Sequence, residues 1–461
     1  MNKWLSKVII AWIIGVLFFL YFDGIEKMYF HQDDILLLAG LTNNFKEFLL
    51  QSAAGHLIFL FNLFYFLEWK IFHLNFNGYL FVSIVLHAAV VGMVMKITYT
   101  IGKNKTWALL SGLAVTINSN FYEVIWMSSS QMMSMSTLFS LVSLWLVIKI
   151  QSFGKIKPHW LLLLFMVAMI PGFTWGTGLP MPFWLLLAFG FEKNKENKIQ
   201  VKEVFWPLLA AQVCLVLIYF RLASNTSSVY VHPQGYLRTV YEMIRFTLFA
   251  FAYSVIGRYF FPFANRIGRQ IVFILSFLYL IRLTIQNRLD KLVFKHSRLW
   301  FFALIVLLGS YMLISLPRWQ FGLGQAAAPR YAYLQIMFLS IAIFSTLANL
   351  KIPNRNISKL MIVLLLLSAL SLGAYTQVTV KWTERPGKNR ELFKLLQNIK
   401  PDQCITDGIL PWYIIESDQW TLSYIWPIFN KNFNPFSNDD GCIKIKRDIT
   451  IPWSPVEKTS S

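Results

Sequence analysis

Two adjacent carboxylates follow the first apolar stretch of the chain. Asp33 and Asp34 end the run YFHQDD at residues 29–34, shortly after an apolar segment that reaches Phe22. Such a segment predicts a membrane span, so the two acids would lie where lipid headgroups meet water. A carboxylate in that position can act as a general base on a hydroxyl group. The alternative interpretation is that the pair is solvated, or that it caps the apolar helix beginning at Ile35.

The composition predicts a membrane protein that crosses the bilayer many times. Of 461 residues, 56% are hydrophobic and 14% are charged, and the mean hydropathy is +0.52, whereas a soluble domain has about 25% charged residues. The net charge of +20 does not indicate nucleic acid, because Lys and Arg occur in short clusters between apolar segments. Clusters of this kind are typical of cytoplasmic loops. No small-residue cleavage site follows the first apolar segment, so we expect an uncleaved signal anchor with a cytoplasmic N-terminus.

The apolar segments predict an all-α polytopic fold with about eleven transmembrane helices, within a range of roughly 10 to 13. Asn62, Glu68 and Lys70 interrupt the stretch at 56–72, so we expect an interfacial or re-entrant helix there, on the outer face. A second membrane-surface element is expected at 239–264, because a span there would place the basic 282–298 loop outside. The predicted spans are 7–22, 78–96, 106–119, 132–150, 159–171, 179–191, 204–220, 270–284, 299–316, 331–349 and 359–376.

The predicted domain organisation follows from this odd number of spans. We expect a transmembrane domain over residues 1–376, with the acids in a first external loop at 23–77, and a small extracytoplasmic domain or cap over 377–461. Cys404 and Cys442 both lie in the last segment. They could form a disulfide in an oxidising compartment or remain two thiols. No Walker-type or G-x-G-x-x-G phosphate loop is present in the sequence, so nothing indicates an ATP-driven pump or a nucleotide-sugar site.

Three further polar positions fall on the predicted outer face. Arg330, next to Tyr331, is a candidate for binding a lipid phosphate, because a guanidinium pairs bidentately with phosphate oxygens. Its alternative role is to anchor a helix end by snorkelling. His56 could bind the phosphate or an acceptor. Glu123 could orient an acceptor, support the first acid, share a divalent cation with the Asp pair, or simply cap a helix.

Four other residues are weaker candidates for a functional site. His87 lies inside a predicted span and is more typical of a packing histidine than of a ligand. Trp126 and Trp175 could stack on sugars, although interfacial aromatic belts explain most of the aromatic residues. Arg318 is a weaker candidate than Arg330 for binding the lipid phosphate. No His-x-x-x-His or Cys-pair spacing indicates zinc.

The order of these motifs resembles the GT-C superfamily, which comprises integral membrane glycosyltransferases that use polyprenyl-phosphate sugars. The superfamily includes protein O-mannosyltransferases, aminoarabinose transferases and transmembrane mannosyltransferases with tetratricopeptide repeats. The resemblance covers residues 20–150 and, more loosely, 310–350. It departs from those relatives in lacking both the repeats and a proline after the Gly-His pair. The motifs that carry it are the Asp pair, Gly55-His56, Gly78-Tyr79, Leu86-His87-Ala88, FYEVIW at 121–126 and Pro329-Arg330-Tyr331.

The resemblance implies a function and a location. It implies an enzyme that moves a sugar from a polyprenyl-phosphate donor to an extracytoplasmic glycolipid, polysaccharide or protein, with Asp33 or Asp34 as general base in an inverting displacement. A retaining reaction would need a carboxylate nucleophile. A bacterial inner or plasma membrane is the expected location. Two other functions remain: a transporter or flippase of a lipid-linked saccharide, and a polysaccharide polymerase or ligase that uses the loop from Arg318 to Arg330.

Overall fold

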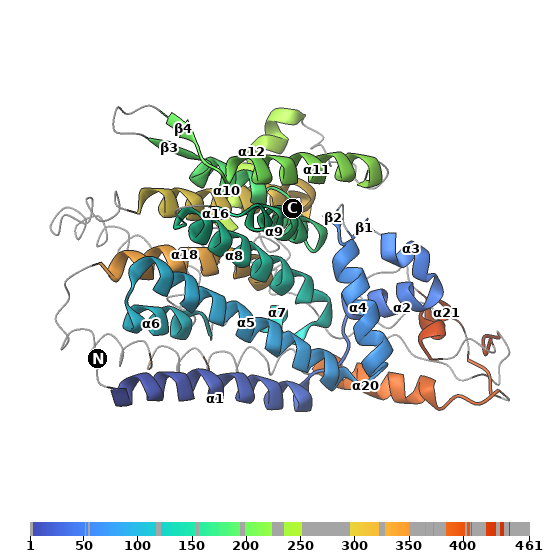
Figure 1. The fold of residues 1–461 in the computed structure, drawn as a ribbon. Helices are drawn as coiled ribbons and strands as arrows, with labels where there is room; N and C mark the ends of the chain where they lie inside the picture. Colours follow the sequence, from blue (N-terminus) through green and yellow to red (C-terminus); the bar gives the residue numbers. More distant parts are fainter. Residues whose placement is uncertain are drawn as a thin grey trace.

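The chain folds into a bundle of α-helices with two short β-hairpins (Figure 1). The computed structural model describes residues 3–50, 52–53, 56–116, 121–153, 156–193, 199–223, 235–250, 296–321, 328–349, 365, 372, 384–401, 403–405, 407, 421–429, 434–437 and 442. Most of the long helices run side by side, and smaller elements gather at the two ends of the bundle.

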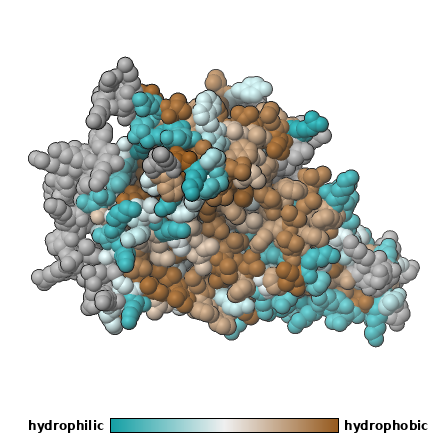
Figure 2. All heavy atoms as spheres, viewed as in Figure 1, coloured by the Kyte–Doolittle hydropathy of each residue, from teal (hydrophilic) through white to brown (hydrophobic). Residues whose placement is uncertain are grey.

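Among the described residues, five helical segments are long and apolar enough to cross a membrane, which makes the chain an integral membrane protein. A broad hydrophobic surface covers the middle of the molecule, and hydrophilic residues lie toward its ends (Figure 2). The five segments include α1 (Lys3–Lys27), α5 (Phe76–Gly102), α8 (Gln131–Gln151) with η1 (Ser128–Ser130), α16 (Ser297–Arg318), and α18 (Tyr333–Leu347) with η6 (Pro329–Ala332).

Three predicted spans form shorter helices, and the prediction at 204–220 corresponds to a helix of 19 residues. Pro171 removes a backbone donor where one of these segments ends, and the chain there turns through η2 (Ile170–Phe173) and η3 (Gly176–Gly178). The predicted spans at 270–284 and 359–376 fall almost wholly outside the described residues, so the total of about eleven stays a prediction. The three shorter helices are α6 (Lys105–Thr116), α9 (Pro158–Met169) and α10 (Met181–Phe189), and the fourth is α11 (Phe205–Ala223).

The helices α5, α6, α8 and α18 pack around one another in the interior. Small side chains on the buried faces of α8 let neighbouring backbones approach closely, which is the usual basis of helix packing in a membrane. Buried serines of α8 are Ser134, Ser136, Ser140 and Ser143.

The loop between α1 and α5 folds into compact elements at one end of the bundle (Figure 1). These are α2 (Asp33–Asn43), α3 (Phe45–Leu50), the antiparallel strands β1 (Ser52–Ala53) and β2 (His56–Leu57), and α4 (Phe59–Phe72). The expected short helix within 56–72 is therefore present, and its 14 residues are fewer than a span needs. A side chain at Gly78 would overlap the ring of Phe72, so this glycine permits α4 and α5 to meet closely.

Two other elements lie away from this loop. The hairpin of β3 (Phe191–Lys193) and β4 (Ile199–Val201) projects at the opposite end of the bundle. Helix α12 (Tyr236–Ala250) covers the first half of the second predicted surface element; residues 251–264 lie outside the described part. It packs against α16 through Met243 and Phe246 and leaves Leu237 and Ile244 exposed.

The C-terminal segment is docked onto the first loop. Helix α20 (Glu384–Gln397) lies beside the loop, and α21 (Leu422–Ile425) with η7 (Trp426–Ile428) contacts α2. Arg390 Nη2 donates to the carbonyl oxygens of Met28 at 2.7 Å and Ile25 at 3.1 Å. These bonds satisfy carbonyl groups that would otherwise be unpaired at the end of α1, which continues to Lys27 rather than ending at residue 22 as predicted.

A disulfide joins Cys404 to Cys442 within this segment, so the pairing that the sequence left open is formed. The adjacent residue Ile405 forms a β-bridge with Phe436. Together these two links hold the described pieces of the C-terminal segment to one another.

Removing the disulfide by Cys404→Ala and Cys442→Ala should destabilise the C-terminal segment. The bridge closes a loop of 38 residues in sequence, and constraining the unfolded chain over that length contributes about 3 to 4 kcal/mol. Limited proteolysis in detergent should cut the double variant faster within residues 384–442. Cys214→Ala is the matched control and should behave as wild type, and an equally resistant double variant would contradict the expectation.

Candidate active site

The acid pair opens helix α2 directly after a reversal of the chain. Gln32 has φ 43° and ψ −110°, an uncommon conformation for a residue with a side chain. Asp33 and Asp34 then occupy the first turn of α2, where free N–H groups favour negative charge. Successive helical residues point about 100° apart, so the two carboxylates face different surroundings.

Asp34 is fully buried and its carboxylate is held on both sides. Its Oδ1 accepts from the backbone N–H of Ser129 at 2.6 Å, and its Oδ2 accepts from the backbone N–H of His31 at 3.1 Å. Burial raises the pKa of Asp34 to about 6, and the bonds from Ser129 and His31 oppose the rise. The side chain therefore ties the start of α2 to η1, 95 residues further along the chain.

Asp33, in contrast, is exposed. It is close enough to Arg330 for the negative charge of its carboxylate to favour the charged guanidinium. Of the two acids, Asp33 is thus the one that a molecule from outside can reach.

Glu123 and Arg330 form an ion pair beside the acids. Glu123 lies on the short helix α7 (Tyr122–Trp126) and is 3% exposed, and its Oε2 accepts from Nη1 of Arg330 at 3.2 Å. The guanidinium of Arg330 lies 5.3 Å from the ring centroid of Tyr331, and that of Arg318 lies 5.8 Å from the same ring. Two cations therefore flank one aromatic ring, and a guanidinium with five donors has capacity for an anion besides its carboxylate partner.

A small cavity adjoins the Arg330 side chain. Its volume of about 10 Å³ is no larger than one water molecule requires. Its lining includes Trp175, Thr177, Arg330, Tyr331 and Gln335, so the loop after α9 and the start of α18 meet here.

A cluster of buried polar side chains lies next to Asp34. Tyr65 Oη lies 3.1 Å from Ser128 Oγ and 3.4 Å from the carbonyl oxygen of Asp34. Burial, with the charge of Asp34 adding to it, raises the pKa of the Glu68 carboxyl well above its ordinary value. Gln131 Nε2 donates to Ser83 Oγ at 3.0 Å.

Most of the predicted site residues come together, but not all. Asp33, Asp34, Glu123, Arg330 and Tyr331 belong to one region at the loop end of the bundle. The side chain of His56 lies outside the described part of the structure, as do residues 117–120 before Glu123.

Two of the less direct candidates are packing residues. His87 is buried, with Nδ1 at 2.7 Å from the hydroxyl of Tyr333 and Nε2 at 3.0 Å from the carbonyl oxygen of Thr116, as expected for a packing histidine. Trp126 is buried too, and its indole N–H donates to the carbonyl oxygen of Leu20 at 3.2 Å. Only Trp175 reaches the Arg330 cavity.

Sequence reasoning did not assign roles to Ser129, Tyr65, Glu68 or Arg390. Glu68 carries a signal, because an acid inside an apolar run is unusual, but that signal argues against a membrane span and does not indicate a site. Ser129 carried none, since its contribution is a backbone N–H that almost any residue would supply.

The three carboxylates do not form a metal-binding group. Among the described residues, no cluster of three or more His, Cys, Asp or Glu side chains could hold a metal ion. Both oxygens of Asp34 already accept N–H bonds, and Glu123 is paired with Arg330. The divalent cation considered for Asp33, Asp34 and Glu123 therefore does not fit this arrangement.

Comparisons with known proteins give a structural likeness. No family model and no curated protein sequence matches the chain. The chain is similar to the crystal structure of ArnT from Cupriavidus metallidurans bound to undecaprenyl phosphate, with a TM-score of 0.47 and 12% sequence identity, over 91% of this chain and 84% of that one.

The pKa of Asp34 predicts a pH-dependent stability. Its folded value of about 6 exceeds the value near 4 in an unfolded chain, so the folded state binds the proton more tightly. Stability from this group is therefore greatest below pH 4 and is lost as pH rises to about 6. As the pH rises from 4 to 7, wild type should lose about 2 to 3 kcal/mol in free energy of unfolding. Asp34→Asn has no group to titrate at this position and should not show this loss.

Unfolding in detergent at several pH values measures this difference. Asp33→Asn, at the neighbouring exposed position, is the matched control, and its stability should run parallel to wild type. A parallel curve for Asp34→Asn would show that its carboxyl is not perturbed by burial.

The Glu123–Arg330 pair should show energetic coupling in a double-mutant cycle. Glu123→Gln leaves a largely buried guanidinium without its carboxylate, which should cost about 2 to 3 kcal/mol of stability. Combining it with Arg330→Gln should cost about 1 to 3 kcal/mol less than the sum of the single changes. The Arg245–Glu242 pair, whose arginine is exposed, is the control and should show less coupling. Additive effects at Glu123 and Arg330 would contradict the ion pair.

Proposed function

We propose that the protein is a membrane glycosyltransferase that moves a sugar from a polyprenyl-phosphate donor to an extracytoplasmic acceptor. The observation that carries the proposal is the division of the acid pair. Asp34 is buried and fixed, while the neighbouring Asp33 is exposed beside the Arg330 cation. A carboxylate that is free to accept a proton, next to a group that binds phosphate, suits attack by a hydroxyl on a sugar linked to phosphate. The motif order that resembles the GT-C superfamily points the same way.

Asp33 is the general base in this proposal. The acceptor hydroxyl attacks the anomeric carbon while its proton passes to the Asp33 carboxylate. The bond from that carbon to the phosphate oxygen breaks, and its electron pair leaves with the polyprenyl phosphate. One displacement inverts the configuration, and no carboxylate nucleophile is needed.

Arg330 stabilises the leaving group. Negative charge builds on the phosphate as the bond breaks, and a guanidinium fixed in advance stabilises that charge without having to reorganise. Glu123 positions Arg330 through their ion pair, and Tyr331 and Arg318 adjoin it. Asp34 positions the base by holding the first turn of α2 against η1.

Two observations support an extracytoplasmic site. The disulfide lies in the segment docked on the acid-bearing loop, and disulfides persist in oxidising compartments. The basic residues Lys193 and Lys202 belong to the region of the β3–β4 hairpin, at the other end of the bundle. Basic loops remain in the cytoplasm. The cap formed by the C-terminal segment and the loop at 23–77 would therefore face outward.

Asp33→Asn should abolish sugar transfer while donor binding persists. The amide keeps the size of the side chain but cannot accept the proton, and loss of a general base lowers the rate by about 10² to 10⁴-fold. The measurement is transfer by the purified chain in lipid with a panel of polyprenyl-phosphate sugars, alongside donor binding.

Asp33→Glu is the matched variant, because it keeps a carboxylate and should retain part of the activity. Undiminished turnover in Asp33→Asn would exclude Asp33 as the base. No turnover by wild type with any donor would instead favour transport of a lipid-linked saccharide.

A further inference from the structure

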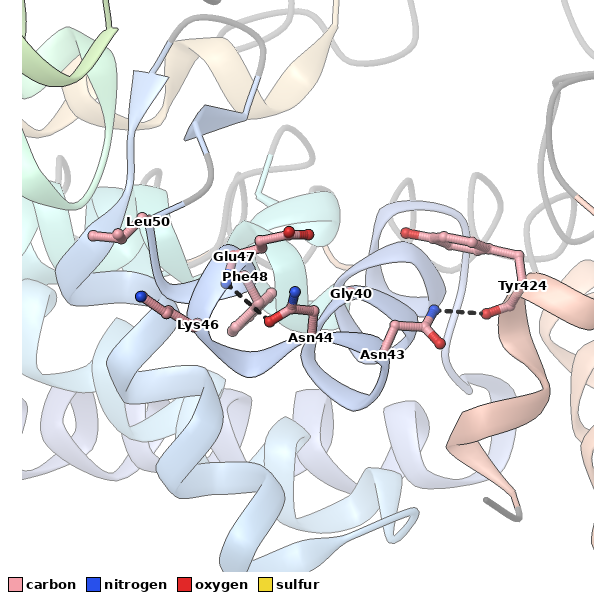
Figure 3. A pocket seen from close by; sticks show the side chains of 8 residues that line it. All are labelled: Gly40, Asn43, Asn44, Lys46, Glu47, Phe48, Leu50 and Tyr424. Atoms are coloured by element: carbon pink, nitrogen blue, oxygen red, sulfur yellow. Dashed lines mark hydrogen bonds between the residues drawn. The ribbon is translucent and has the colours of Figure 1, made fainter. Parts of the chain in front are cut away.

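A second, larger pocket opens at the far end of α2. It has a volume of about 600 Å³, within the range of pockets that bind small molecules. Helix α2 has 11 residues, so the pocket lies about 15 Å along the helix from Asp33. Figure 3 shows its lining, which consists of Gly40, Asn43, Asn44, Lys46, Glu47, Phe48, Leu50 and Tyr424.

The lining offers hydrogen-bonding groups of several kinds. Asn43 and Asn44 are exposed amides that can each donate and accept. The carboxylate of Glu47 and the hydroxyl of Tyr424 point toward one another across the pocket (Figure 3). The single Lys46 and the single Glu47 balance in charge, so the pocket is not an electrostatic trap for an anion.

These groups match the chemistry of a saccharide. A sugar ring carries many hydroxyl groups that need both donors and acceptors, and amides with a carboxylate supply them. It also has apolar C–H faces, against which an aromatic ring such as that of Tyr424 can pack. A lipid tail would leave the amides and charges unpaired.

Two distant segments build the pocket and hold its walls together. Asn43 Nδ2 donates to the carbonyl oxygen of Tyr424 at 2.9 Å, which ties α2 to α21. On the other side of Tyr424, the backbone N–H of Ser423 donates to Asp407 Oδ1 at 3.1 Å. Asp407 follows closely after the disulfide-bonded Cys404.

We propose that this pocket binds a saccharide part of the acceptor, at a distance from the reacting hydroxyl. The inference rests on the proposed function, because it places the pocket and Asp33 along one helix at the same end of the molecule. An acceptor held at both points would be a chain of several sugar units rather than a single small alcohol.

Saccharide binding to the full chain in lipid nanodiscs tests the proposal. The probes are maltotriose, triacetylchitotriose and trigalacturonate, which represent neutral, N-acetylated and acidic chains, and binding is titrated by saturation-transfer NMR. We expect at least one probe to bind. Glu47→Gln and Tyr424→Phe should each weaken its affinity by about fivefold, the effect of one lost hydrogen bond.

Two controls separate the pocket from the fold and from the reaction. Glu391→Gln, at an exposed position of α20, should leave binding unchanged. Asp33→Asn should bind the saccharide as wild type does. Failure of all three probes to bind, or binding that ignores both pocket substitutions, would overturn the pocket proposal.

The two proposals can fail separately. The protein could bind a saccharide through Glu47 and Tyr424 but transfer no sugar from any donor. That result would support the saccharide site and contradict the transferase. Sugar transfer that depends on Asp33, without saccharide binding at the pocket, would support the transferase and contradict the saccharide site.

Discussion

The bonds between the buried Asp34 carboxylate and two backbone N–H groups fix the geometry of the candidate site. One bond comes from Ser129 and the other from His31, so a single side chain joins the first loop to the start of α8. Burying a carboxylate without such bonds would be strongly unfavourable. The position of the exposed Asp33 follows directly, because it is the preceding residue of the same helical turn.

The same region is held from a second direction by the C-terminal segment. Asn389 donates to the carbonyl oxygen of Phe30 at 2.9 Å, and Arg390 reaches the end of α1. The ring of Phe393 packs against those of Tyr29 and Phe30. The four residues before Gln32 are therefore enclosed by polar and aromatic contacts, which stabilise the uncommon backbone conformation at that residue.

The sequence was informative about membrane segments and about the side of the molecule on which the polar residues gather. Hydropathy predicted the five long spanning helices, and the predicted topology put Glu123 and Arg330 on the same face as the acid pair. It could not distinguish Asp33 from Asp34, because that depends on the direction of one turn and on a backbone N–H 95 residues away. Nor could it predict Arg390 at the end of α1, since a cap formed between distant segments leaves no local pattern.

The contact between Asn389 and Phe30 spans 359 positions of the chain. A growing polypeptide emerges N-terminus first, so α1 and the acid-bearing loop exist long before α20 has been made. Until then, the loop lacks the donors that satisfy its carbonyl groups and the ring of Phe393 that covers it. A segment that is synthesised much later thus completes an earlier one, and a product that stops before α20 would carry both aspartates without the enclosure that orients them.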